Sequence, residues 1–210
     1  MKKKTLGIVM AASFGILLAA SISIGATYSL WSAKTSVQNH LTSGNLALKL
    51  ERTKLSKCNL NNDTGYLVTS TDTQVKDFTN TTTADSNVFD IESGELVVPG
   101  SYYEATLKLS NVGSVAFDYT VKLALSDANP DALASQLKVY IDGTASDYLY
   151  NVNNNGKFDI TAGQMGKEDL AKEFTIKVQF EDLEVNNSAM DQKANFDITI
   201  DATQATTKKV

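Results

Sequence analysis

The chain has 210 residues, of which 42% are hydrophobic and 20% charged, and its formal net charge at pH 7 is −5. Because an acidic surface repels phosphate groups, nucleic acids and anionic membranes are disfavoured as partners. The lone cysteine, Cys58, excludes an intramolecular disulfide, and a buried, inert thiol is favoured over a crosslink between chains.

The N-terminal region has the pattern of a secretory signal peptide. Residues 2–4 are lysines, and the 21 residues of 6–26 carry no charge. Thr27 and Ser29 are small residues two apart, a spacing that signal peptidases accept, so we expect cleavage between Ser29 and Leu30. An uncharged stretch of this length could also be a retained membrane anchor, which is the second interpretation.

Cleavage at this point would leave a mature chain of 181 residues with a net charge of −8, because three lysines and no acids are removed. A chain of that length is enough for one domain with its own core. We therefore expect a signal peptide (1–29), an N-terminal segment (30–42) and one folded domain (43–210). The mature protein is expected to be exported, with membrane contact limited to the precursor.

Alternating apolar and polar residues predict β-strands along most of the mature chain. The clearest alternating runs are 45–51, 102–110, 114–125, 137–143, 173–183 and 194–204. A period of two with one apolar face is typical of antiparallel sheets that each cover one side of a core. Two such sheets packed together predict an all-β fold, an antiparallel β-sandwich.

One or two short helices and one polar insertion complete the predicted fold. The stretch 129–137, "NPDALASQL", has a capping asparagine followed by proline and predicts a short connecting helix. A further helical turn is expected in 166–174, before the next strand. Segment 51–93 is rich in Thr, Asn, Asp and Ser, which predicts a long surface insertion with a hairpin around 65–71, "GYLVTST".

The chain shows no catalytic constellation. A metalloprotease helix carries two histidines one turn apart with a glutamate between them, and His40 is the only histidine here. A Ser-His-Asp triad would also need His40, for which a structural or solvated role is favoured. We therefore predict no catalytic residue and no cofactor.

One segment resembles a calcium loop. In "NVNNNGKFDI", Asn151, Asn153 and Asn155 take alternate positions, Gly156 would make a sharp turn, and Asp159 stands at the ninth place. The first three ligands would be neutral amides, and the twelfth position carries alanine rather than glutamate. An Asn-Gly turn between strands explains the same residues without metal, so no metal site is predicted.

The stretch just after the expected cleavage site has an amphipathic strand pattern. Its apolar residues fall on odd positions up to 41, whereas the even positions from 32 to 42 are all polar. The apolar positions are Trp31, Ala33, Val37 and Leu41. Either this strand belongs to its own sandwich, or cleavage frees it to complete the open sheet edge of a neighbouring molecule. The pattern leaves both interpretations open.

Several segments together resemble one family. The leader ends in "GATYSLWSAKTS", "LTSGNLAL" follows, and later come "LVVPGSYYEATLKLSNVGSVAFDYTVKL", "FTIKVQFED" and "FDITIDATQAT". In this combination the chain resembles the TasA/camelysin family of secreted proteins from Gram-positive bacteria, whose leaders are cut by the signal peptidase SipW. Leu41 replaces an aromatic residue of the family's pattern, and segment 51–93 departs from its compact form.

The resemblance implies a jelly-roll-like sandwich that polymerises into fibres of an extracellular biofilm matrix at the cell surface. In such fibres the N-terminal segment of one subunit fills a groove of the next. The residues implied in this self-assembly are Leu30, Trp31, Ala33, Val37 and Leu41. Expected partners are other copies of the chain, a SipW-type peptidase and a fibre-anchoring accessory protein. The alternatives are a camelysin-like cell-surface metalloendopeptidase and a monomeric accessory protein or adhesin.

Overall fold

The computed structural model describes the backbone of residues 31–39 and all atoms of 46–79, 87–91, 95, 97–126, 132–183, 189, 192 and 194–207. These residues form eleven β-strands. The strands are β1 (Trp31–Asn39), β2 (Leu48–Leu60), β3 (Leu67–Asp72), β4 (Lys76–Asp77), β5 (Tyr102–Asn111), β6 (Phe117–Leu125), β7 (Leu137–Ile141), β8 (Thr144–Tyr148), β9 (Lys157–Met165), β10 (Lys172–Phe180) and β11 (Ala194–Gln204).

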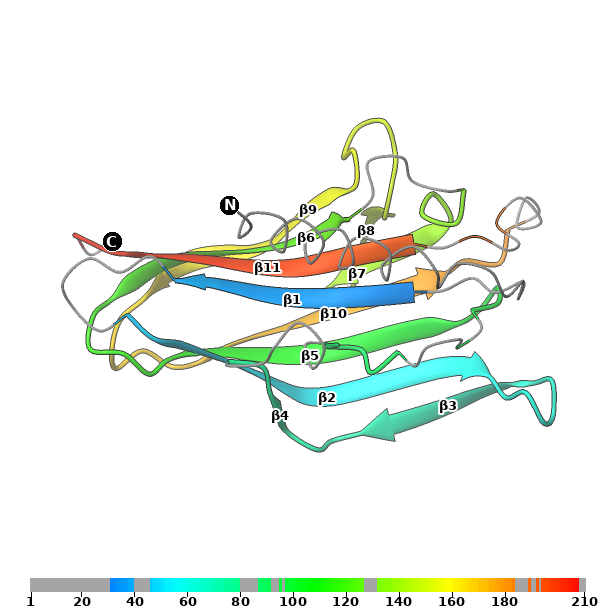
Figure 1. Ribbon diagram of the computed structural model, residues 1–210, viewed down its shortest axis with the longest axis horizontal. Helices are drawn as coiled ribbons and strands as arrows, with labels where there is room; N and C mark the ends of the chain where they lie inside the picture. Colours follow the sequence, from blue (N-terminus) through cyan, green and yellow to red (C-terminus); the bar gives the residue numbers. More distant parts are fainter. Residues whose placement is uncertain are drawn as a thin grey trace, which may run out of the picture.

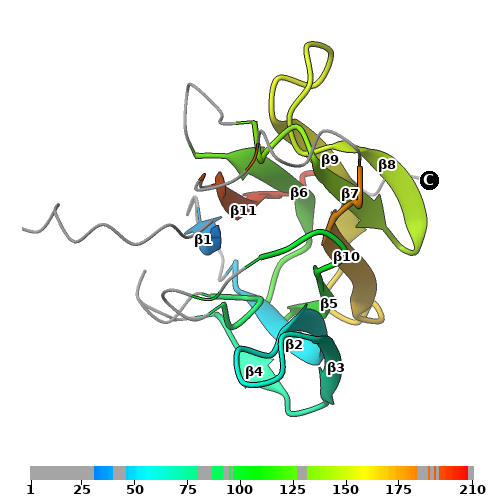
Figure 2. The ribbon, with the colours of Figure 1, turned by 90° about the vertical axis from the view of Figure 1, so that its right-hand side faces the viewer.

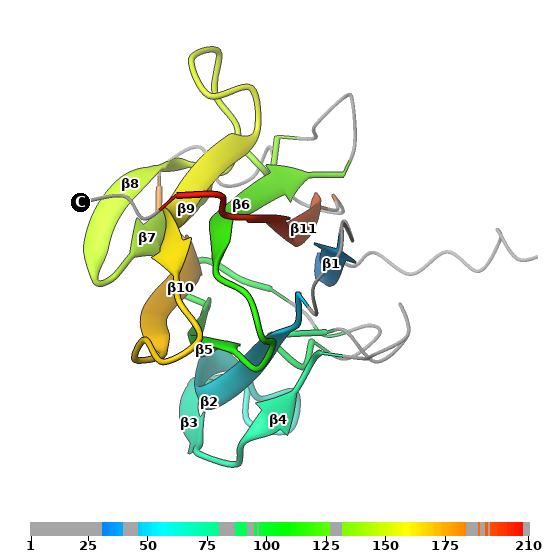
Figure 3. The ribbon, with the colours of Figure 1, turned by 90° about the vertical axis from the view of Figure 1, so that its left-hand side faces the viewer.

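The strands form two sheets that pack face to face (Figure 1). The four-stranded sheet has the order β1-β11-β6-β9, and the seven-stranded sheet has the order β3-β2-β5-β10-β7-β8, with β4 paired to β2. All pairs of neighbouring strands are antiparallel except β1 and β11, which run parallel. The two end views show β3 and β4 farthest from the four-stranded sheet (Figures 2 and 3).

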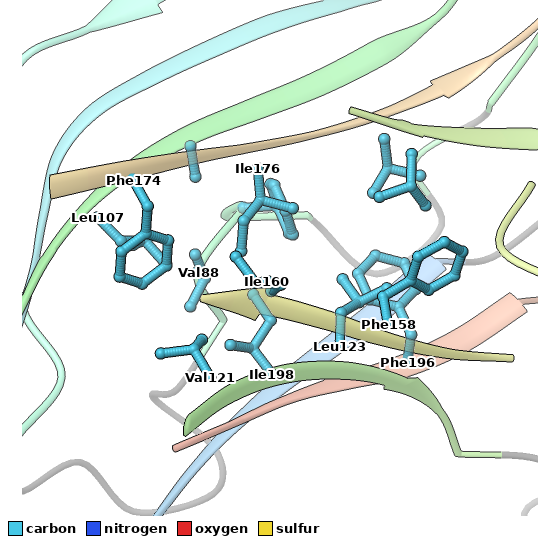
Figure 4. Close-up of a cluster of buried hydrophobic side chains, with 14 of the residues drawn as sticks. Val88, Leu107, Val121, Leu123, Phe158, Ile160, Phe174, Ile176, Phe196 and Ile198 are labelled. Carbon is cyan, nitrogen blue, oxygen red and sulfur yellow. The ribbon is translucent and has the colours of Figure 1, made fainter. Parts of the chain in front are cut away.

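The core lies between the sheets and follows the period of two that the sequence shows. Every second residue along β5, β10 and β11 is buried, and the residues between them are partly exposed. Figure 4 shows side chains of both sheets meeting in this layer, among them Leu107, Phe174 and Ile176 of one sheet and Val121, Leu123, Phe158, Ile160, Phe196 and Ile198 of the other. Each large apolar side chain buried in this way contributes about 1.5–3 kcal/mol to folding.

The predicted all-β sandwich is confirmed, and its connections are those of a jelly roll. The chain changes sheet between β1 and β2, between β5 and β6, between β6 and β7, between β8 and β9, and again before β10 and β11. Asn111 shapes the crossing from β5 to β6. Its side-chain amide donates to the carbonyl of Val115 over 2.9 Å, and its side-chain oxygen accepts the N–H of Gly113 at 2.9 Å. The turn at 111–113 therefore joins strands of different sheets.

Segment 51–93 is only partly the surface insertion that its composition predicts. Residues 51–60 continue β2, which pairs with β5 through a bulge between Arg52 and Lys54. The expected hairpin is present as β2 and β3, and its outer strand is exposed throughout. The chain then returns to the interior, where Phe78, Val88 and Phe89 are buried. The ring of Phe89 packs edge-on against Phe196 of β11, with centroids 5.9 Å apart.

Turns stand where one or two short helices were predicted. In the first candidate, residues 132–136 are turns and Leu137 begins β7, and one i to i+3 hydrogen bond of 2.9 Å joins the N–H of Gln136 to the carbonyl of Leu133. In the second candidate the carboxylate of Asp169 accepts the N–H of Gly166 at 2.5 Å, which closes a single turn. Within the described part of the chain, no helix is long and apolar enough to cross a membrane.

Candidate functional site

The strand β1 forms the outer edge of the four-stranded sheet. Its nine residues pair in parallel register with β11, from Trp31 opposite Ala194 to Asn39 opposite Ala202. Among the described strands, β11 is the partner of β1. Figures 2 and 3 show β1 at one flank of the molecule, beyond β11. An N-terminal segment at a sheet edge makes its contacts through one row of backbone hydrogen bonds.

The odd positions of β1 lie in register with the buried positions of β11. Trp31, Ala33 and Val37 stand opposite Ala194, Phe196 and Ile200, and all three of these β11 residues are at most 2% exposed. The apolar positions that the sequence predicted in β1 therefore lie in register with the buried residues of β11. Because β6 occupies the other side of β11, loss of β1 would leave one edge of β11 without its hydrogen-bond partners.

Three of the five residues implied in self-assembly lie in β1: Trp31, Ala33 and Val37. Leu30 and Leu41 lie outside the described residues, as do Thr27, Ser29 and His40. The structure therefore joins Trp31, Ala33 and Val37 on one strand of the molecule's own sheet, which is one of the two arrangements that the sequence left open.

The Asn-rich segment before β9 is held by its own side chains. The side-chain oxygen of Asn151 accepts the N–H groups of Asn153 and Asn154 over 2.7 and 3.0 Å. That of Asn154 accepts the N–H groups of Asn151 and Gly156. Gly156 has a φ of +71°, and a Cβ there would lie 2.7 Å from a methyl group of Leu125, so this position requires glycine.

Calcium is expected to leave the thermal midpoint of the protein nearly unchanged. A ligand stabilises a fold only by binding its native state, and the Asn151 oxygen already accepts two backbone hydrogen bonds. The measurement is a thermal melt with and without excess calcium, with magnesium as the ionic control. A rise of several degrees that disappears in Asn153→Ala and Asp159→Ala would contradict this prediction.

A charged cluster surrounds Arg52, a buried residue that the sequence analysis did not single out. Its guanidinium donates to the carbonyl of Val88 over 2.8 Å and lies 2.6 Å from the carboxylate of Asp90 and 3.5 Å from that of Asp72. Lys76 bonds the second oxygen of Asp90 over 2.7 Å. Burial acts to raise the pKa of Asp90, but its bonds to Arg52 and Lys76 outweigh this and hold the pKa below its usual value. The cluster ties segment 87–91 to β2.

Tyrosines and lysines alternate on the outer face of the seven-stranded sheet. The ammonium of Lys177 lies over the rings of Tyr102 and Tyr140, 4.6 and 4.8 Å from their centroids. Glu181 accepts the hydroxyl of Tyr148 over 2.7 Å, and this bond, followed by burial, raises the pKa of Tyr148. For Tyr140, burial is the larger cause of a raised pKa, and Glu181 adds to it. These contacts stabilise the outer face of the sheet.

Residues of the types that bind metals or act as nucleophiles are dispersed in the described part of the chain. No three His, Cys, Asp or Glu side chains there are grouped so that they could hold a metal ion. Cys58 is half-buried in β2, between Thr69 of β3 and Tyr102 of β5. A hollow of about 280 Å³ at one end of the sandwich is lined by residues that include Gln164, whose amide donates to the carbonyl of Thr207.

No protein-family model and no curated protein matches the chain. The functional argument therefore depends on the chain's own residues and on the arrangement of its strands. One feature that can act between molecules is β1, because it precedes all other described strands and lies at a sheet edge.

Proposed function

We propose that the protein is a secreted structural subunit that polymerises head to tail into extracellular fibres, by exchange of β1 between neighbouring molecules. The observation that carries this proposal is the place of β1. It is the first of the described strands, it lies at an edge of its sheet, and it runs parallel to β11, the last of the described strands. The family resemblance and the acidic, strand-rich mature chain support the same function.

The topology makes this exchange simple. An edge strand at the start of the mature chain can leave its sheet without threading past any other strand. The β1 of a second molecule can then restore the same nine residue pairs with β11, so the hydrogen bonds lost within one molecule are regained between two. Each subunit gives one strand and accepts one at a different surface, and such a contact does not close on itself. Repeated contacts of this kind produce a filament.

Chain processing is expected to control assembly. A protein that begins at Leu30 should form filaments visible by electron microscopy, whereas the same protein with a folded tag ahead of Leu30 should remain monomeric, since the tag obstructs insertion of β1 into a neighbour. A matched control carries the tag at the C-terminus and should still polymerise.

The same samples test the competing functions. Release of a labelled peptide that stops on addition of a chelator would indicate a metalloendopeptidase. Monomers from every version, at all concentrations, would indicate an accessory protein or adhesin. Either result would overturn the proposed function.

A further inference from the structure

The outer strand of the β2–β3 hairpin has an unprotected edge. β3 lies at the end of the seven-stranded sheet, and among the described strands it pairs with β2 alone. All six of its residues are exposed, because the four-stranded sheet does not extend this far (Figures 2 and 3). Leu67 and Val68 are 41% and 45% exposed, and the adjoining Tyr66 is 74% exposed. β3 therefore presents apolar side chains beside a row of backbone groups with which no other described strand pairs.

The usual protection of edge strands is absent from β3. Natural edges carry lysines, prolines or bulges that prevent further pairing. The sequence of β3, "LVTSTD", has no lysine or proline, and its register with β2 from Leu55 opposite Asp72 to Leu60 opposite Leu67 is unbroken. From Tyr66 to Thr71 it has no charge, and its valine and threonines favour extended structure.

The hairpin turn holds this edge in place. The side-chain oxygen of Asn61 accepts the N–H groups of Asp63 and Thr64 over 2.9 and 3.0 Å. Backbone bonds join Gly65 and Tyr66 to Asn61 over 2.8 and 2.9 Å, and Gly65 has the positive φ that this turn needs. A rigid edge loses little conformational entropy when another strand is added.

We propose that the free edge of β3 pairs antiparallel with β3 of a second copy of this chain, about a two-fold axis at Thr69. The distribution of charge along β3 favours a second copy of the chain as the partner and an antiparallel direction of pairing. Pairing about Thr69 places Val68 opposite Ser70 and the carboxylate-bearing Asp72 opposite the partner's Tyr66. A parallel arrangement would instead place the two Asp72 residues side by side, and like charges directly opposite each other destabilise a sheet.

A second copy fits the strand better than a charged partner would. The edge offers no charge from Tyr66 to Thr71 for an acidic or basic peptide to recognise, whereas two identical neutral strands match each other in length and character. Six paired residues bury less than the roughly 1,200 Å² of a stable interface, so isolated molecules should pair weakly. Along two filaments the contact would repeat many times and bundle them laterally. The pairing itself does not depend on the proposed fibre function.

Cysteine crosslinking tests both the partner and the direction. In a Cys58→Ser background, Thr69→Cys should form disulfide dimers at high protein concentration, because the two-fold axis brings the two residues opposite each other. Leu67→Cys and Thr71→Cys should not crosslink alone, since each copy of the same residue would lie about 13 Å from the other. A mixture of these two variants should crosslink.

The crosslinking results distinguish antiparallel pairing of β3 from parallel pairing and from no pairing. Crosslinking of all three variants alone would indicate a parallel pair, and absence of crosslinks in every sample would remove β3 as an interface; both outcomes overturn the proposal. Filaments without β3 crosslinks would defeat this inference alone, whereas β3 crosslinks without filaments would support it and defeat only the fibre function.

Charge on the edge supplies an independent test in solution. Analytical ultracentrifugation of the wild-type chain should show a concentration-dependent dimer, and Val68→Lys with Thr69→Lys should abolish it, with an unchanged far-UV spectrum. The matched control is Thr144→Lys with Ser146→Lys in β8, the exposed strand at the opposite end of the same sheet. That control should dimerise like the wild-type chain. Equal dimerisation of the β3 variant and the control would contradict the proposal.

Discussion

A disulfide that joins β1 to β11 within one molecule is expected to abolish filament formation, and its reduction should restore it. Ser36 and Thr199 are register partners, so cysteines at these two positions lie on neighbouring strands at a spacing that a disulfide can bridge. The variant is Ser36→Cys with Thr199→Cys in a Cys58→Ser background. Because donor-strand exchange requires β1 to leave its own sheet, the oxidised protein should remain monomeric. Electron microscopy and sedimentation of oxidised and reduced samples measure whether filaments form.

A control disulfide in the other sheet distinguishes the effect of fixing β1 to β11 from a general effect of crosslinking. Thr106 of β5 and Thr175 of β10 are also register partners, in the sheet that does not contain β1. The Thr106→Cys, Thr175→Cys variant in the same background should polymerise whether oxidised or reduced. Filaments of normal length from the oxidised Ser36→Cys, Thr199→Cys protein would show that β1 is not donated, and the strand would then belong permanently to its own sandwich.

Mixed single variants test the contact between molecules directly. Protein with Ser36→Cys and protein with Thr199→Cys should give a crosslinked dimer when they assemble together, because β1 of one would lie beside β11 of the other. Ser32→Cys mixed with Thr199→Cys should not, since Ser32 pairs with Asn195, four residues away along β11 or roughly 13 Å.

The strands that the sequence predicted correctly are those whose alternation is complete. β5, β10 and β11 each bury one side, and the apolar residues of that side stand at every second position. β9 was missed because it follows an asparagine-rich turn and because its second half, "TAGQM", contains one large apolar residue. Its burial pattern also breaks where the register with β6 shifts, between Val121 and Lys122. The alternation of apolar residues therefore identifies strands such as β5, β10 and β11, which bury one regular face, and misses β9, whose burial is irregular.

The pattern of apolar and polar residues could not predict contacts between residues that are distant in the sequence. An arginine at position 52 suggests a residue at the protein surface. Only the fold brings Asp90 and Asp72 to the guanidinium of Arg52, and these contacts make its burial possible. For the candidate site, the sequence predicted that Trp31, Ala33 and Val37 lie on one strand. It did not indicate that the strand would run parallel to β11, about 160 residues later. The choice of partner depends on which sheet edges remain open after the rest of the chain has folded.

Loss of the Asp90 carboxylate is expected to destabilise the fold at neutral pH by about 2 kcal/mol. Removing one member of a buried ion pair costs about 3–5 kcal/mol, but the side chain of Asp90 is 35% exposed, and water screens its interactions. Asp90 has a φ of +46°, a conformation that asparagine also tolerates, so Asp90→Asn changes the charge and little else. Urea unfolding measures the effect. The control is Asp201→Asn, whose partner Lys122 is 4.0 Å away and whose side chain is 48% exposed; it should cost well under 1 kcal/mol.

The stabilising effect of Asp90 should also depend on pH, in a direction that its pKa determines. Although burial opposes ionisation, the bonds and charges of Arg52 and Lys76 lower the pKa of Asp90 in the folded state. A group with a lowered folded-state pKa stabilises the fold fully above its unfolded pKa, about 3.9 for aspartate, and this stability is lost as the pH falls through the folded value. The gap in unfolding free energy between wild type and Asp90→Asn should therefore be constant from pH 7 to about pH 5 and should narrow below about pH 4. A gap that stays constant down to pH 3, or that widens in acid, would show that the Arg52–Asp90 ion pair is not what secures segment 87–91 to β2.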